Sequence, residues 1–266
     1  MKRQSITIGS KFLVLLDFSE TSLAALRYTI KLAKTVLGEI SLYHAAKAAD
    51  VCATTHEQQK IREQLESIIE MIETEGIKAH SHYETGKTKK LIGNKIKSYE
   101  PDVVVVGKES NISSKSSQVT KFLIEQYDGH LLVVGDNGDF QEDTKITVAL
   151  DGLSIEENNL KTASDLAKCS ENPLTIVNIT DDHLGYKQSP FDKSWDASGI
   201  KNFKVEHFKS ENIEKGLKEY ISNKEAQLLC ISRNTNKKSW FDKLMGKTSC
   251  ITSLMKNINV PVLVLS

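Results

Sequence analysis

The chain has 266 residues, enough for one large domain or for two domains of ordinary size. Hydrophobic residues make up 39% and charged residues 26%, a balance typical of a globular protein with a substantial core. Lys plus Arg equals Asp plus Glu at 35 each, so no overall electric field favours nucleic acid or an acidic membrane as a partner.

The cysteines and the N-terminal residues indicate a reducing compartment. The four cysteines are scattered and include no CxxC pair, which argues against a disulfide framework and against a zinc ribbon. Residues 1–10 are polar and predict no signal peptide, and the apolar runs are far shorter than a membrane span. Aromatic residues are only 6%, with no basic stripe interleaved. We therefore expect a cytoplasmic protein with neither nucleic acid nor membrane as a partner.

The first half alternates short apolar runs with amphipathic helix patterns. It opens with an apolar run that ends in Asp17, followed by a helix pattern with apolar residues at three-and-four spacing. Further strands are expected at 40–44, 77–83, 103–106 and 130–134. Further helices are expected at 56–75, after Gly86 and around 119–123. The valines at 103–106 suit a strand that is buried on both faces of a sheet.

The second half repeats this pattern. Its first apolar run ends in Asp151, and a capping box of Ser154 and Glu157 precedes an amphipathic helix. Further strands are expected at 174–179, 203–208, 228–231 and 262–265. Further helices are expected around 213–220 and 251–255. The stretch 181–199 has weak periodicity, and we interpret it as a long loop that replaces the second helix of the first half.

Strands that alternate with helices predict parallel sheets joined by right-handed crossovers. The repeat therefore predicts two doubly wound, five-stranded α/β domains joined head to tail. The polar stretch at 135–143 is the expected boundary, and it divides the chain into domains at 1–138 and 139–266.

The segments LLDFSETSLAALRYTIKLAK and PDVVVVG, and the tail SWFDKLMGKTSCITSLMKNINVPVLVLS, resemble the universal stress protein family. The resemblance covers both halves, as in the tandem subtype with two family domains in one polypeptide. It implies a flavodoxin-like, adenine nucleotide alpha hydrolase-like fold. The last strands of two domains pair in this family, so the resemblance also implies an intramolecular pseudo-dimer, and beyond it a dimer of tandem chains.

Members of the family that bind ATP carry a glycine loop after the fourth strand. Its glycines let phosphates approach backbone N–H groups at a helix N-terminus. In the first half Gly107 fits the first glycine, whereas Ser110 stands at the second and Thr120 at the third. The Ser-rich segment 109–117 offers hydroxyl groups to an anion, or alternatively forms a solvated loop.

The second half departs less completely from the glycine pattern. Gly246 matches the third glycine, and counting back places Asn236 and Arg233 at the other two positions. Asn adopts the left-handed conformation, though less readily than Gly. Lys247 stands where Ser or Thr is expected, with Thr248 one residue later. The basic segment suits an anion, and the alternative is again a solvated loop.

Asp17 and Asp151 stand where the resemblance places the Asp that contacts adenine or ribose. Open α/β sheets bind ligands at this end of their strands. The alternative is that each Asp opens the strand-to-helix turn through its own side chain. We prefer the turn role for Asp151 and leave both roles open for Asp17.

Two further patterns could indicate a binding site: a Gly-Lys-Thr run and a pair of histidines. Gly86-Lys87-Thr88 looks like the end of a P-loop, but Ser81 stands where that motif needs a glycine. His80 and His82 share one face of a strand and could share a metal ion, although spacing brings no Cys or carboxylate to them. We interpret them as partly exposed strand histidines, with no metal site.

The sequence thus favours a stress-response regulatory or binding protein with degenerate nucleotide-binding loops, which contacts protein partners and is not an enzyme. One alternative is a switch that binds ATP or AMP at the Gly246 loop and hydrolyses ATP slowly at most. Another alternative is a carrier of a small molecule or metal ion, with 181–199 as its lid.

Overall fold

The computed structural model describes residues 6–7, 9–47, 55–108, 115–136, 138–150, 157–181, 202–211, 213–224, 226–232 and 258–266. The chain forms two compact units. Thr7–Phe140 is the first unit, and Gln141–Ser266 together with Met1–Ile6 is the second. Two contacts tie residues 139 and 140 to the first unit: Lys31 donates to Asp139 at 2.5 Å, and the ring of Phe140 packs edge-on against Tyr28.

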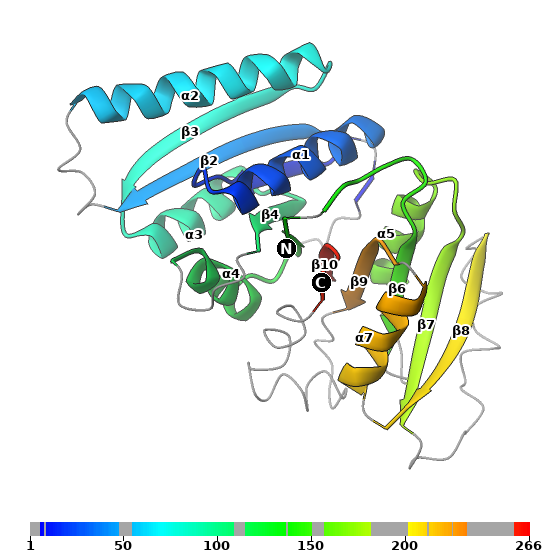
Figure 1. Cartoon of the computed structure of the whole chain (residues 1–266). Coiled ribbons are helices and arrows are strands. Elements are labelled where there is room, and N and C mark those ends of the chain that lie inside the picture. Colours follow the sequence, from blue (N-terminus) through cyan, green and yellow to red (C-terminus); the bar gives the residue numbers. More distant parts are fainter. Residues whose placement is uncertain are drawn as a thin grey trace. The chain divides into compact units, whose positions relative to one another are not determined.

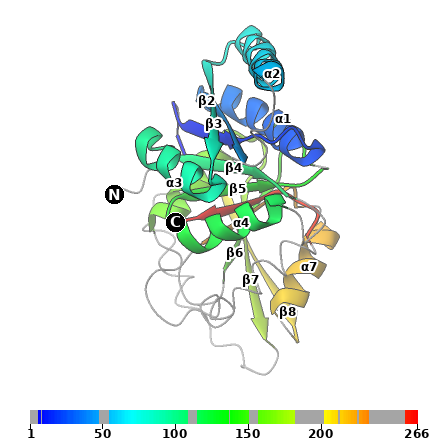
Figure 2. The same cartoon turned by 90° about the vertical axis from the view of Figure 1, so that its left-hand side faces the viewer.

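The first unit has five strands and four helices among its described residues. The strands are β1 (Lys11–Leu15), β2 (Glu39–Lys47), β3 (Ala79–Gly86), β4 (Val103–Gly107) and β5 (His130–Val134). The helices are α1 (Glu20–Thr35), α2 (Thr55–Thr74), α3 (Thr88–Tyr99) and α4 (Lys115–Gln126). The strands lie in the order β3-β2-β1-β4-β5, and all their pairings are parallel. Helices α1 and α2 cover one face of this sheet, and α3 and α4 cover the other (Figures 1 and 2).

Local sequence explains how this unit assembles. The Ser19 hydroxyl caps α1 by accepting a hydrogen bond from the backbone nitrogen of Ser22 at 3.3 Å. Leu26 and Ala33 of α1 are buried, as the three-and-four spacing predicts, whereas Leu37, the last apolar residue of that spacing, lies beyond the helix and is 72% exposed. The four valines of β4 are at most 3% exposed, which confirms that this strand is buried on both faces.

The second unit has the same order of strands. Its strands are β6 (Ile146–Leu150), β7 (Leu174–Asp181), β8 (Phe203–Ser210), β9 (Leu228–Ser232) and β10 (Val262–Leu265), in the order β10-β9-β6-β7-β8, with parallel pairings. Its described helices are α5 (Glu157–Ala167) and α7 (Ile213–Lys224). The predicted helix at 251–255, the loop at 182–199 and the capping residue Ser154 lie outside the described residues. Two doubly wound, five-stranded parallel sheets confirm the predicted fold class.

The strand registers align the two units residue by residue. Leu15 and Ala149 each stand two residues before the Asp that ends the first apolar run. Leu15 pairs with Val106 in β4, and Ala149 pairs with Ile231 in β9. Val106 and Ile231 are therefore equivalent, and so are the residues that follow them. In the described part of the chain, no helix is long and apolar enough to cross a membrane.

Candidate functional site

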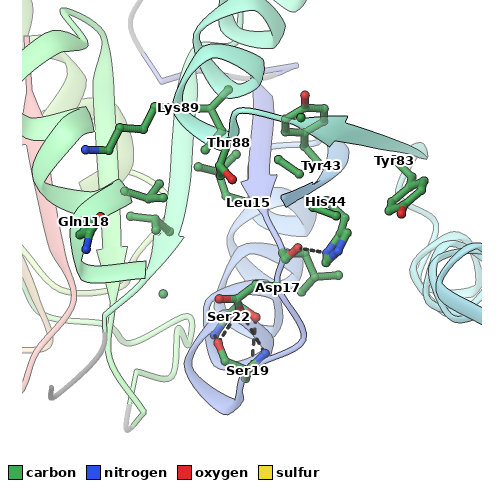
Figure 3. Close-up of a pocket in the computed structure, with 18 of the residues that line it drawn as sticks. Leu15, Asp17, Ser19, Ser22, Tyr43, His44, Tyr83, Thr88, Lys89 and Gln118 are labelled. Atoms are coloured by element: carbon green, nitrogen blue, oxygen red, sulfur yellow. Dashed lines mark hydrogen bonds between the residues drawn. The ribbon is translucent and has the colours of Figure 1, made fainter. Parts of the chain in front are cut away.

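A cavity of about 940 Å³ opens in the first unit, where its strands end. Its walls come from the ends of β1, β2 and β4, from the first turns of α1 and α3, and from α4 (Figure 3). Strand β1 lies between β2 and β4, and the chain reaches β4 only after it has built β3. This is the switch point at which open α/β sheets bind ligands, because the connections diverge there and leave a crevice.

Asp17 lines this cavity and also organises the turn into α1. One of its carboxylate oxygens accepts hydrogen bonds from the backbone nitrogen of Ser19 at 3.1 Å and from the Ser19 hydroxyl at 2.5 Å. Burial acts to raise the pKa of Asp17, but hydrogen bonds from Ser19 and Ser22 outweigh it, so the pKa is lowered. The carboxylate is therefore ionised at neutral pH. Both roles left open by the sequence are compatible with this geometry.

His44, at the end of β2, forms another wall of the cavity. Its Nδ1 lies 2.7 Å from the carbonyl oxygen of Leu16. Because a carbonyl oxygen only accepts, Nδ1 is the protonated nitrogen and Nε2 of the neutral ring is an acceptor. The ring lies between Phe18, at 5.1 Å between centroids, and Tyr83, stacked at 5.6 Å. Burial lowers the pKa of His44, although the Leu16 carbonyl and Asp17 oppose it.

The β3–α3 turn brings positive charge to the cavity. Lys87, Lys89 and Lys90 all line it, together with Thr88 between them. No side chain caps the N-terminus of α3, where Lys87 is the capping residue. The Lys89 ammonium lies 5.9 Å from the ring centre of Phe122 in α4. In the sequence this Gly-Lys-Thr run resembles only the end of a P-loop, and its place in the same cavity as Asp17 follows from the sheet order.

Gly107 lines the cavity, but a contact inside the protein accounts for it. A Cβ atom at this position would lie 2.5 Å from the carbonyl carbon of Thr21, so only glycine lets the end of β4 meet the first turn of α1. The family resemblance implies that Gly107 is the first glycine of a phosphate loop. Ser110, the next position of that loop, lies outside the described residues, so this role stays a prediction.

In the second unit, the register places Ser232 at the position equivalent to Gly107. The Ser232 hydroxyl accepts a hydrogen bond from Asn159 Nδ2 at 2.7 Å. Counting back from Gly246 placed Arg233 at this position, one residue later than the strand pairing does. The other predicted site residues of this half lie outside the described residues: Asp151, Arg233, Asn236, Gly246, Lys247 and Thr248.

The three histidines of β2 and β3 do not form one cluster. Tyr43 pairs with His82 and His44 pairs with Tyr83, so alternation places His44 on the opposite face of the sheet from His80 and His82. Burial lowers the pKa of His80 and His82, and the nearby charge of Lys95 adds to this effect. Among the described residues, no group of three or more metal-ligating side chains is assembled.

The fold is that of a doubly wound α/β protein, and its cavity lies where sheets of this class bind ligands. The model of the universal stress protein family matches residues 10–135, so the first unit belongs to that family. The length of 266 residues and two units of one fold fit a tandem arrangement. No curated protein matched the sequence.

Solved structures resemble the chain in fold. A universal stress protein from Archaeoglobus fulgidus superposes with a TM-score of 0.75 at 19% identity, over 96% of this chain and 98% of that chain. The cytoplasmic domain of a prokaryotic cation chloride cotransporter superposes with a TM-score of 0.60 at 12% identity, over 96% of this chain and 95% of that chain. A universal stress protein family protein from Arabidopsis thaliana, solved with AMP bound, has a TM-score of 0.37 at 19% identity, over 48% of this chain and 92% of that chain. The TM-scores of the first two structures show a shared fold and leave function to the site.

Proposed function

We propose that this chain is a stress-response regulatory protein that binds an adenine nucleotide in the cavity of its first unit. The observation that carries the proposal is the cavity itself, which joins the Asp17 carboxylate, the His44 ring and a lysine-bearing turn at the switch point of the sheet. Its volume of about 940 Å³ is at the upper end of small-molecule sites, which is room enough for a nucleotide.

The chemistry of the walls suits the parts of a nucleoside. An ionised carboxylate accepts hydrogen bonds from ribose hydroxyls, and Asp17 keeps acceptor capacity beyond its bonds to Ser19. Nε2 of His44 offers an acceptor to an exocyclic amine, and the aromatic walls beside it suit a flat base. These groups bind and orient a ligand. A role in contacting protein partners, and a second site at the Gly246 loop, stay predictions from the sequence.

Direct binding tests this proposal. Native mass spectrometry of the freshly purified chain should show a bound nucleotide. Calorimetric titration with ATP, AMP and adenosine should show saturable binding. Ala46→Trp fills the cavity with an indole ring and should abolish that binding. Asn94→Trp, on the exposed side of α3 and outside the cavity lining, should leave it unchanged.

The proposal fails if none of the three compounds binds to the wild-type chain. It also fails at this site if Ala46→Trp and Asn94→Trp bind as the wild type does. Unfolding curves of both variants establish that each is folded before its binding is compared.

A further inference from the structure

The cavity of the first unit has two chemically different sides. Figure 3 shows Asp17, Ser19 and Ser22 along one side, and Thr88 and Lys89 along the other. The first side carries a carboxylate and the second carries the lysines of the β3–α3 turn. An anionic group on a ligand is repelled by the first side and attracted by the second.

The β3–α3 turn has the features of an anion-binding turn. The first hydrogen bond of α3 runs from the Leu91 nitrogen to the Lys87 carbonyl at 3.0 Å, so the N–H groups of residues 88–90 precede the helical ladder. No side chain caps this end. Free N–H groups and the positive end of the helix dipole favour an anion. The hydroxyl of Thr88 stands at the same end of the helix and lines the cavity.

Tyr43 lies on the same side of the cavity and is 1% exposed. Its hydroxyl has no hydrogen-bond partner of ordinary geometry among the described residues, although the Glu84 carboxylate lies near it. Burial, the charge of Glu84 and a hydrogen bond to that carboxylate raise the pKa of Tyr43, so the hydroxyl keeps its proton. A ligand that accepts from this hydroxyl would compete with Glu84.

Among the described residues, the side of the cavity next to α4 carries fewer groups that could bind a phosphate. Gly107 is the only residue of the first half that fits the family's glycine pattern, and contact with α1 explains it. The space that a missing Cβ leaves there is already filled by the backbone of Thr21 and Ser22. Packing against α1 therefore explains this glycine without any phosphate.

We propose that the cavity binds the phosphate of its ligand at the β3–α3 turn, with Lys87, Lys89 and Lys90 and the N-terminus of α3, instead of at a glycine loop after β4. This inference rests on the proposed function and makes it more specific. The ligand is then a phosphorylated nucleoside that lies with its sugar towards Asp17 and its phosphate towards α3. A nucleoside without phosphate lacks the interaction with the lysines.

Comparison of adenosine with AMP tests the placement. The probes are these two compounds, titrated into the full chain by calorimetry at low and at high NaCl. The wild type should bind AMP at least about tenfold more tightly than adenosine, and salt should weaken AMP binding more. The triple variant Lys87→Gln, Lys89→Gln, Lys90→Gln should lose most of that preference and bind adenosine within about twofold of the wild type.

A charge-matched control removes three exposed lysines outside the cavity lining: Lys60→Gln, Lys97→Gln, Lys209→Gln. It should keep the AMP preference, which separates local contact from net charge. Unfolding midpoints of both triple variants establish that the loss does not come from misfolding.

The outcomes separate the two proposals. Equal binding of adenosine and AMP by the wild type, or an AMP preference that survives in the lysine variant, overturns the phosphate placement and leaves nucleotide binding intact. Loss of the preference with Ser110→Glu but not with the lysine variant also overturns it, because the phosphate then lies after β4. If neither compound binds, the proposed function falls and this inference falls with it.

Discussion

A Cβ atom on Gly107 would lie 2.6 Å from the backbone nitrogen of Ser22. Neither backbone segment can move easily, because Ser22 belongs to the first turn of α1 and Gly107 belongs to a central strand with neighbours on both sides. The end of β4 and the start of α1 are thus packed backbone against backbone, and this contact forms one wall of the cavity.

Gly107→Ala should lower the free energy of unfolding by about 1–3 kcal/mol, since the added methyl group overpacks this contact. Gly93→Ala is the matched control: a Cβ there meets nothing within 4 Å, and the change should stabilise the helix interior by about 0.5–1 kcal/mol. Urea unfolding of both variants measures the difference. A Gly107→Ala variant as stable as the wild type would show that the contact is loose.

Ser19→Ala should weaken both the α1 cap and the turn held by Asp17. The lost cap should cost about 1 kcal/mol of unfolding free energy at pH 7. The pKa of Asp17 should rise towards its ordinary value, because the hydrogen bond from the Ser19 hydroxyl is lost while the one from the backbone nitrogen remains. NMR titration of the Asp17 carboxyl carbon in both proteins measures this shift, and an unchanged pKa would contradict it.

The ionised Asp17 should make stability depend on acid pH. Its folded pKa lies below the ordinary value of 3.8, so its stabilising contribution is complete above that value and is lost as pH falls through the folded pKa. The wild type should therefore lose more stability than Asp17→Asn as pH is lowered below 3.8. Unfolding curves at a series of acid pH values test this, and parallel pH profiles would argue against it.

His44 should contribute a second pH dependence, nearer to neutrality. Its folded pKa is below the ordinary 6.5, so its neutral form is favoured by folding and stability falls as pH drops below 6.5. His44→Asn keeps a donor for the Leu16 carbonyl, does not titrate, and should flatten the profile between about pH 7 and pH 5. The register places Asn178 at the equivalent position of the second unit. A His44→Asn variant with the same profile as the wild type would contradict this.

In the second unit, Ser232→Ala should cost about 1–3 kcal/mol of unfolding free energy, because it removes the acceptor of Asn159 Nδ2. Asn159 is fully buried, and its Oδ1 already has no partner among the described residues. Replacing both partners leaves neither group without the other. The double change Asn159→Ala, Ser232→Ala should therefore cost less than the sum of the two single changes. A thermodynamic cycle measures this, and strict additivity would contradict it.

Much of the fold could be predicted because its signals are local. The apolar run before Asp17, the valines of β4 and the spacing within α1 predicted their elements within a few residues. Strand β3 was predicted at 77–83 but runs from Ala79 to Gly86, since its alternation of polar and apolar residues is weak at both ends. The candidate site was predicted less well: Asp17 and Gly107 do line the cavity, whereas His44 and the lysines of the β3–α3 turn were not assigned to it.

By itself, the sequence determined the alternation of strands and helices, the repeat and the family resemblance, because periodicity and caps act between residues that are neighbours along the chain. Only the tertiary structure decided that Lys87 lines the same cavity as Asp17 and that Gly107 packs against the backbone of α1. Those relationships join residues far apart in the chain. They depend on the order in which parallel strands pair, and no local pattern encodes that order.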